Sequence, residues 1–279
     1  MTKLRRVASR RLPRTDKSPA ARKSPKTQPA PPVSPRWVDT WLGPVEGQSK
    51  KPGKSVVLHK HVVAAATTTD DSAQLAASMT VPGGSGDASD AALVAAEVAR
   101  VPVEILQRAK DQGIKVIACR DSVTDVCTEL KGVTPRGWPP GSTWDSVPGL
   151  YEPTRRAVVV ATRPGATESA ARHVPLSGEG EGAYDLFLHE FAHSLDYRHC
   201  LPGVDSSSRA FTAAYAADKA SLTSHSETYL LQPGKAGQEE CFAETFDRFF
   251  AGDATLKAEL PHLYAFWKSA DAKLGGSAQ

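Results

Sequence analysis

A short motif of two histidines and one glutamate carries the clearest chemistry in the chain. The sequence His-Glu-Phe-Ala-His occupies residues 189–193. If this segment is helical, His189 and His193 lie four residues apart on one face, and both can direct a ring nitrogen at one ion. Glu190 then lies beside the open side of that ion. Two histidines, a third ligand and a neighbouring carboxylate are what a hydrolytic zinc site needs, so the motif predicts a Zn²⁺ site with Glu190 as the base.

The third ligand must come from another segment, and the phenylalanine-rich stretch over residues 238–251 offers two carboxylates. Its apolar residues recur at helical spacing, which predicts an amphipathic helix. Glu240 and Glu244 are four residues apart and share the face opposite the phenylalanines. A carboxylate on an otherwise buried helix is unfavourable unless it is paired or binds metal. We therefore expect one of them to bind the ion and the other to support a ligand histidine.

Both segments resemble a known family. The string HEFAHSLD at residues 189–196, followed by ECFAETFDRFF at residues 240–250, resembles the gluzincin-type zinc peptidases of the anthrax lethal factor clan. That clan includes the Pro-Pro endopeptidases and Mlc titration factor A. A looser similarity extends to residues 130–151 and to the Pro-His-Leu-Tyr segment at residues 261–264. The resemblance covers about Ala91 to Leu274.

The resemblance implies a role for each site residue. Zn²⁺ is bound by His189, His193 and Glu240, and Glu190 is the general base. Outside the ligand set, it implies that Glu244 and Asp196 support the site, Asp196 by fixing the zinc helix through hydrogen bonding.

The same family places an oxyanion-stabilising tyrosine seven residues before the ligand glutamate. That position is Pro233 here. Tyr229 takes the role if this chain carries a four-residue insertion, and Tyr215 and His225 are the alternatives. An oxyanion donor contributes a rate factor of about 10²–10³.

The elements that must position these residues suggest an α+β fold. We expect a zincin-like metallopeptidase domain with a small sheet and a helical zinc-binding half, preceded by a disordered N-terminal tail. Periodicity and breaker residues predict helices at residues 89–100, 102–112, 184–197, 238–251 and 261–274, and strands at residues 115–120 and 155–162. The second strand is either an edge strand, beside which an extended substrate can pair, or a plain core strand.

Charge divides the chain into unlike parts. Residues 1–60 hold 15 Lys and Arg against 3 Asp and Glu, and 9 of the 21 prolines. The remainder holds 19 basic and 28 acidic residues, so a tail of net charge +12 precedes a part of net charge −9. Such a composition is typical of a disordered segment joined to a globular domain. We expect a basic tail over residues 1–52, a short apolar patch with a flexible linker over residues 53–88, and the peptidase domain over residues 89–279.

The tail leaves the location of the protein open. No apolar run of 7–15 residues follows its basic start, so a Sec-type signal peptide is not expected, and no run is long enough to span a membrane. The protein is then cytoplasmic or exported by another route. The basic tail is also compatible with contact to nucleic acid or a membrane surface.

The sequence predicts a zinc-dependent endopeptidase that acts on a protein or peptide, with an exported toxin or effector as one role. One alternative is a metalloprotease tethered to DNA by the tail, a class that uses a third histidine as ligand. The other is a degenerate metallopeptidase fold that serves as a binding module. Four cysteines without a Cys-x-x-Cys pair predict buried free thiols rather than a disulfide scaffold.

Overall fold

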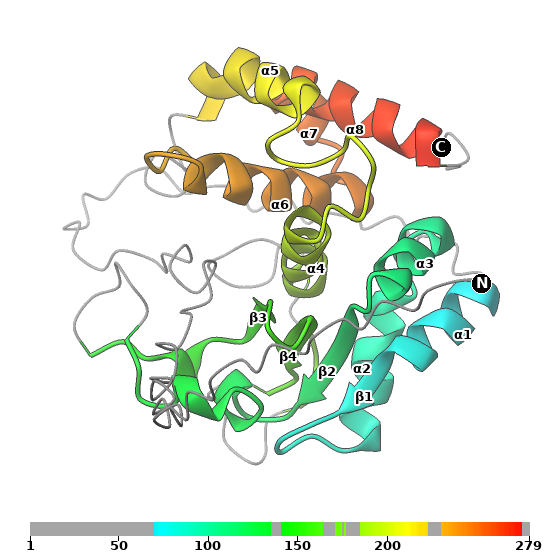
Figure 1. Cartoon of the computed structure of the whole chain (residues 1–279), viewed down its shortest axis with the longest axis vertical. Coiled ribbons are helices and arrows are strands. Elements are labelled where there is room, and N and C mark those ends of the chain that lie inside the picture. The colour runs from blue at the N-terminus through cyan, green and yellow to red at the C-terminus, as the bar shows by residue number, and fades with distance from the viewer. Residues whose placement is uncertain are drawn as a thin grey trace, which may run out of the picture. The chain divides into compact units, whose positions relative to one another are not determined.

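The computed structural model describes residues 70–134, 141–163, 171–174, 176, 185–222 and 230–274. Within them a small sheet is joined to a set of helices, which confirms the expected α+β class (Figure 1). The helices are α1 (Asp70–Met79), α2 (Ala88–Val98), α3 (Val103–Asp111), α4 (Leu186–Tyr197), α5 (Arg209–Asp218), α6 (Ala236–Phe250), α7 (Leu256–Glu259) and α8 (Pro261–Leu274). The strands are β1 (Thr80–Pro82), β2 (Lys115–Cys119), β3 (Gly149–Glu152) and β4 (Ala157–Ala161). None of the described helices is long and apolar enough to cross a membrane.

The sheet has the strand order β1-β2-β4-β3. The strands β1, β2 and β4 are parallel, with Val116 opposite Val158, and β3 pairs antiparallel to β4, with Tyr151 opposite Val158. Of the two alternatives for residues 155–162, the structure therefore shows the core strand and not the edge strand. Because β4 pairs with β2 on one side and with β3 on the other, β3 is the edge strand on this side of the sheet.

Both faces of the sheet are buried, which explains the nearly continuous apolar runs in its central strands. Alternate residues of β2 and β4 point to opposite faces. Val116 and Val158 join the core formed with the helices, while Ile117 and Val159 join a second, smaller core. Short 3₁₀ turns between residues 123 and 146 close this second core, and Trp144 is buried there. Trp138, the other tryptophan of this segment, lies outside the described residues.

The helix α4 lies between the sheet and α6. It contacts β3 and β4 on one side and α6 on the other (Figure 1). The apolar face of α6 is held in turn by α8, because Phe242 and Phe246 pack on Trp267 with ring centroids 4.9 and 5.3 Å apart. The predicted helices at residues 184–197, 238–251 and 261–274 are thus confirmed within two residues at each end.

The fold begins earlier in the chain than the sequence suggested. The expected linker over residues 53–88 includes α1 and β1, and β1 is paired with β2. Ala76 and Met79 of α1 are buried in the main core. The expected domain boundary at residue 89 is therefore too late. The expected tail over residues 1–52, and residues 53–69 of the expected patch and linker, lie outside the described residues.

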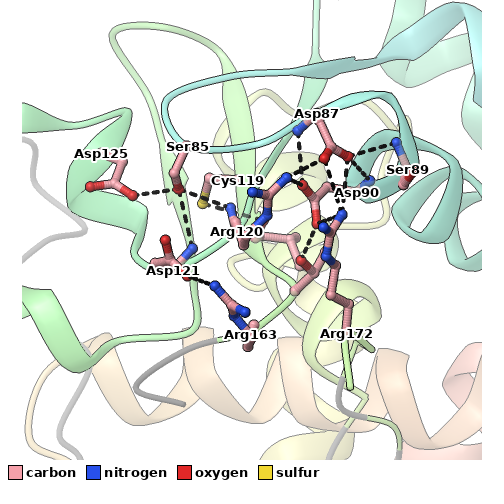
Figure 2. A network of polar contacts seen from close by, with 12 residues as sticks. Ser85, Asp87, Ser89, Asp90, Cys119, Arg120, Asp121, Asp125, Arg163 and Arg172 are labelled. Carbon is pink, nitrogen blue, oxygen red and sulfur yellow. Dashed lines mark hydrogen bonds and ion pairs between the residues drawn. The ribbon is translucent and has the colours of Figure 1, made fainter. Parts of the chain in front are cut away.

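The glycines at residues 83–86 suggested flexibility, but they allow a tight turn into α2. The backbone N–H of Gly83 donates to the carbonyl oxygen of Ala118 at 3.0 Å, and a Cβ on Gly86 would overlap that same oxygen. The hydroxyl of Ser85 donates to Asp125 and accepts from the backbone N–H of Arg120 (Figure 2). A closely packed turn and a flexible linker can both be rich in glycine and serine, so the sequence alone does not distinguish between them.

Candidate metal centre

The two histidines of the motif lie on a helix that is buried on every side. All residues of α4 from Leu186 to Asp196 are buried. Asp185 caps the helix, since its carboxylate accepts a hydrogen bond of 3.0 Å from the backbone N–H of Leu188. A capped and fully packed helix keeps side chains on adjacent turns in a fixed register. The ring nitrogens of His189 and His193 consequently meet at one point, with their Nε2 atoms 3.2 Å apart.

Glu240 of α6 completes the group. Its Oε2 atom lies 3.4 Å from Nε2 of His189 and 3.2 Å from Nε2 of His193. A tetrahedral zinc ion with bonds of about 2.0–2.2 Å separates neighbouring ligand atoms by about 3.3–3.6 Å. The three donor atoms therefore fit such an ion in both type and spacing. In the part of the chain that the structure describes, these residues form the one group of three or more His, Cys, Asp or Glu with metal-ligand geometry.

The protonation states of Glu240 and His193 depend strongly on one another. Burial opposes ionisation of Glu240, but the two histidines outweigh it and hold the pKa of its carboxyl at about 2. Burial also disfavours the charged form of His193, but Glu240 reverses that effect and raises the pKa of the imidazole to about 9. Because a histidine that binds metal must be a neutral imidazole, metal binding at this site would release the proton of His193.

Glu190 lies beside the candidate metal ligands and is held by the edge strand. Its Oε2 atom accepts a hydrogen bond of 3.0 Å from the backbone N–H of Tyr151. Burial raises the pKa of Glu190, although the two histidines partly offset the rise. The strand approaches closely because position 149 is glycine. A Cβ there would lie 2.8 Å from Cδ1 of Leu186 and 3.3 Å from Cγ of Glu190.

Asp196 and Glu244, the two expected supporting residues, lie at opposite ends of the site. Asp196 is buried in the last turn of α4 and accepts a hydrogen bond of 2.7 Å from the backbone N–H of Ser206. This bond attaches the end of α4 to the segment that leads into α5. Glu244 lies one turn after Glu240. Burial raises the pKa of its carboxyl, and His189 is the neighbour that most offsets the rise.

The oxyanion-stabilising residue is not identified by the geometry. Tyr229, the expected residue, and His225 both lie outside the described residues. Tyr215 is described, and its hydroxyl donates a hydrogen bond of 2.7 Å to the carbonyl oxygen of Leu230. That hydroxyl therefore holds the loop before α6.

Sequence reasoning missed three features of the site. Gly149 and the backbone of Tyr151 belong to β3, a strand that was not among those predicted from the sequence. The cap at Asp185 had a local signal, because an aspartate directly before an apolar helical run is typical of a helix start. Asp247 of α6, which accepts a hydrogen bond of 2.9 Å from the backbone N–H of Asp185, had no local signal.

Comparison with known proteins agrees with this arrangement. The family described as "Anthrax toxin lethal factor, N- and C-terminal domain" matches residues 67–270. The Pro-Pro endopeptidase of Paenibacillus alvei is 30% identical over 194 residues, which is 67% of this chain and 79% of that protein. The Pro-Pro endopeptidase of Clostridioides difficile is 32% identical over 192 residues, which is 66% of this chain and 77% of that protein.

The solved structure of the Paenibacillus alvei enzyme matches with a TM-score of 0.53 at 29% sequence identity. The match covers 72% of this chain and 99% of that chain. A buried His-Glu-x-x-His helix that faces a glutamate from a second helix, on an α+β fold, defines a metallopeptidase. By its sequence match the chain belongs to the lethal-factor-like family of zinc metallopeptidases, and it is a peptidase.

Proposed function

We propose that the chain is a zinc-dependent endopeptidase in which His189, His193 and Glu240 hold the ion and Glu190 is the general base. The convergence of three buried donor atoms within 3.2–3.4 Å of one another is the observation that supports this proposal. Zinc bound there supplies Lewis-acid activation of water and of the scissile carbonyl group. Every other step falls to residues of this chain.

Glu190 takes a proton from the attacking water and returns it to the leaving amine. Its raised pKa suits this role, because a base whose pKa lies nearer to neutral pH can both accept and return a proton. The hydrogen bond from Tyr151 fixes one carboxylate oxygen, so the other is available to water. Tyr229 is the proposed donor to the oxyanion.

The substrate binds as an extended peptide along β3. The backbone N–H of Tyr151 bonds Glu190 rather than β4, so this edge of the strand faces the site. An edge strand can pair with a peptide backbone through main-chain hydrogen bonds. Both curated relatives are named Pro-Pro endopeptidases, so a peptide with consecutive prolines is the first substrate to test.

Export as a toxin or effector remains part of this proposal. A DNA-tethered protease that uses a third histidine is the competing function, and Glu240 in the third-ligand position supports the lethal-factor-like alternative. The intact motif at residues 189–193 likewise supports an enzyme over a degenerate binding module.

The test compares the purified chain with its Glu190→Gln and Glu240→Gln variants. We expect about one zinc per chain in the parent and in Glu190→Gln, and a strong loss of zinc in Glu240→Gln. New peptide N-termini, profiled in a proteome digest and with proline-rich peptides, should appear with the parent and disappear with Glu190→Gln. Zinc-free parent protein, or cleavage that persists in Glu190→Gln, would contradict the proposal.

A further inference from the structure

The start of the histidine helix is bonded to the helix that carries the glutamate ligand. Asp247 of α6 accepts a hydrogen bond of 2.9 Å from the backbone N–H of Asp185, the residue that caps α4. Asp247 lies seven residues, or about two turns, beyond Glu240 on the same face of α6. Asp185 lies one turn before His189. The bond therefore joins the two ligand-bearing helices one turn from His189 and about two turns from Glu240.

A third segment is attached at the same point. The carboxylate of Asp185 forms an ion pair of 2.5 Å with Arg100, which follows α2 and also pairs with Glu97 at 2.7 Å. The cap of α4 is thus bonded through its side chain to the end of α2, and through its backbone to α6. Translation or rotation of α4 against either neighbour would break one of these bonds.

The environment makes these contacts strong. Asp185 and Asp247 are both 0% exposed, so water does not compete for their oxygens. A carboxylate is also stabilised at the positive N-terminal end of a helix, where backbone N–H groups have no partner within the helix. Hydrogen bonds that involve a charged partner are stronger than those between neutral groups. An unpaired carboxylate at this depth would be unfavourable.

We propose that Asp247, together with Asp185 and Arg100, acts as a positioning group. It fixes the separation of α4 and α6 so that His189, His193 and Glu240 are in ligand geometry before the metal enters. This inference rests on the proposed zinc site. It assigns these residues no contact with substrate.

The main experiment measures zinc affinity in Asp247→Ala and Asp247→Asn. Alanine removes the acceptor for the Asp185 N–H, whereas asparagine retains an oxygen in the same position. Loss of residues that orient metal ligands lowers metal affinity by about 10–100-fold, and we expect that range for Asp247→Ala. Asp247→Asn should stay much closer to the parent. Zinc dissociation constants are obtained by competition with a chromogenic chelator, on protein shown by circular dichroism to be folded.

A matched control comes from another buried aspartate. Asp90 is also 0% exposed and is bonded to Arg120, Arg172 and Thr162, on segments other than α4 and α6 (Figure 2). Asp90→Ala should lower stability while zinc affinity of the folded protein stays near that of the parent. If Asp247→Ala does not fold, Arg100→Met replaces it, and we expect weaker zinc binding there too.

The kinetics separate positioning from substrate binding. In Asp247→Ala, kcat should fall at saturating zinc while KM stays near its parent value, since the residue is assigned no contact with substrate. Zinc affinity that falls no further in Asp247→Ala than in Asp90→Ala would overturn the inference. If Arg100→Met is the variant measured, a zinc affinity equal to that of the parent would overturn the inference. A parent protein that binds no zinc would instead overturn the proposed function, so the two failures are distinguishable.

Discussion

The backbone N–H of Tyr151 in the edge strand donates a 3.0 Å hydrogen bond to Oε2 of Glu190 in the histidine helix. One strand residue thus holds the carboxylate that we propose as the base, and it lies where a peptide would pair. Any change that moves β3 away from α4 should therefore disturb the chemistry before it disturbs the metal ligands.

Gly149→Ala disturbs this contact. The new Cβ would lie 2.8 Å from Cδ1 of Leu186 and 3.3 Å from Cγ of Glu190, so these side chains or the strand itself must shift. Small displacements of catalytic groups can reduce rates on the order of 10²-fold, and we expect a loss of kcat approaching that size. Zinc content should be unchanged. Adding Leu186→Ala removes the closest contact and should restore part of the rate, whereas full activity in Gly149→Ala alone would contradict the prediction.

Metal removal should lower stability as well as activity. Zinc binds the folded protein through residues that are apart in an unfolded chain, so it stabilises by about 2.7 kcal/mol when free zinc is 100-fold above its Kd. We expect a chelator to lower the thermal midpoint and abolish cleavage, and added zinc to restore both. The midpoint of His193→Ala should not respond to zinc. A parent midpoint that is the same with and without zinc would count against the metal centre.

The carboxylate of Asp87 should contribute to acid sensitivity. A hydrogen bond from the backbone N–H of Asp90 is the largest cause that lowers its pKa from 3.8 to about 2, with Arg120 and Arg172 adding to the effect (Figure 2). A lowered folded-state pKa stabilises above the unfolded value and loses that contribution as pH falls. The stability difference between the parent and Asp87→Asn should therefore be constant above about pH 5 and shrink between pH 4 and 2. Urea unfolding across this range measures it, and a difference that is independent of pH would refute it.

The four thiols should be unreactive in the folded protein. All four cysteines are buried and free, and burial raises the pKa of Cys119 and Cys127 to about 12 and that of Cys200 to about 11. The reactive thiolate is then scarce at neutral pH. A thiol reagent should modify none of them in the native state and all four after unfolding. Rapid labelling of folded protein would indicate that one of them is exposed.

The candidate metal ligands were predictable because their constraints are local. His189 and His193 are one helical turn apart, and the phenylalanines of α6 left one face for Glu240. Spacing alone did not decide between Glu240 and Glu244 as ligand. The choice followed from the family resemblance, and the structure brings Glu240 to the histidines.

The features that could not be predicted from the sequence depend on contacts between segments that are distant in the chain. The strand β3 has only four residues within a segment rich in glycine and proline, and its edge position follows from pairing with β4. The bond between Asp247 and Asp185 joins residues 62 positions apart. Neither relation leaves a periodic signal, so neither could be derived from one sequence.

The pairing of β1 with β2 has a practical consequence for recombinant design. A polypeptide cut at Ser89 would lack α1 and β1, leaving Val116 and Ala118 of β2 without their strand partners. An apolar strand with an open edge is a template for aggregation. A minimal enzyme should therefore start before Asp70, and a fusion partner should be attached on that side of α1.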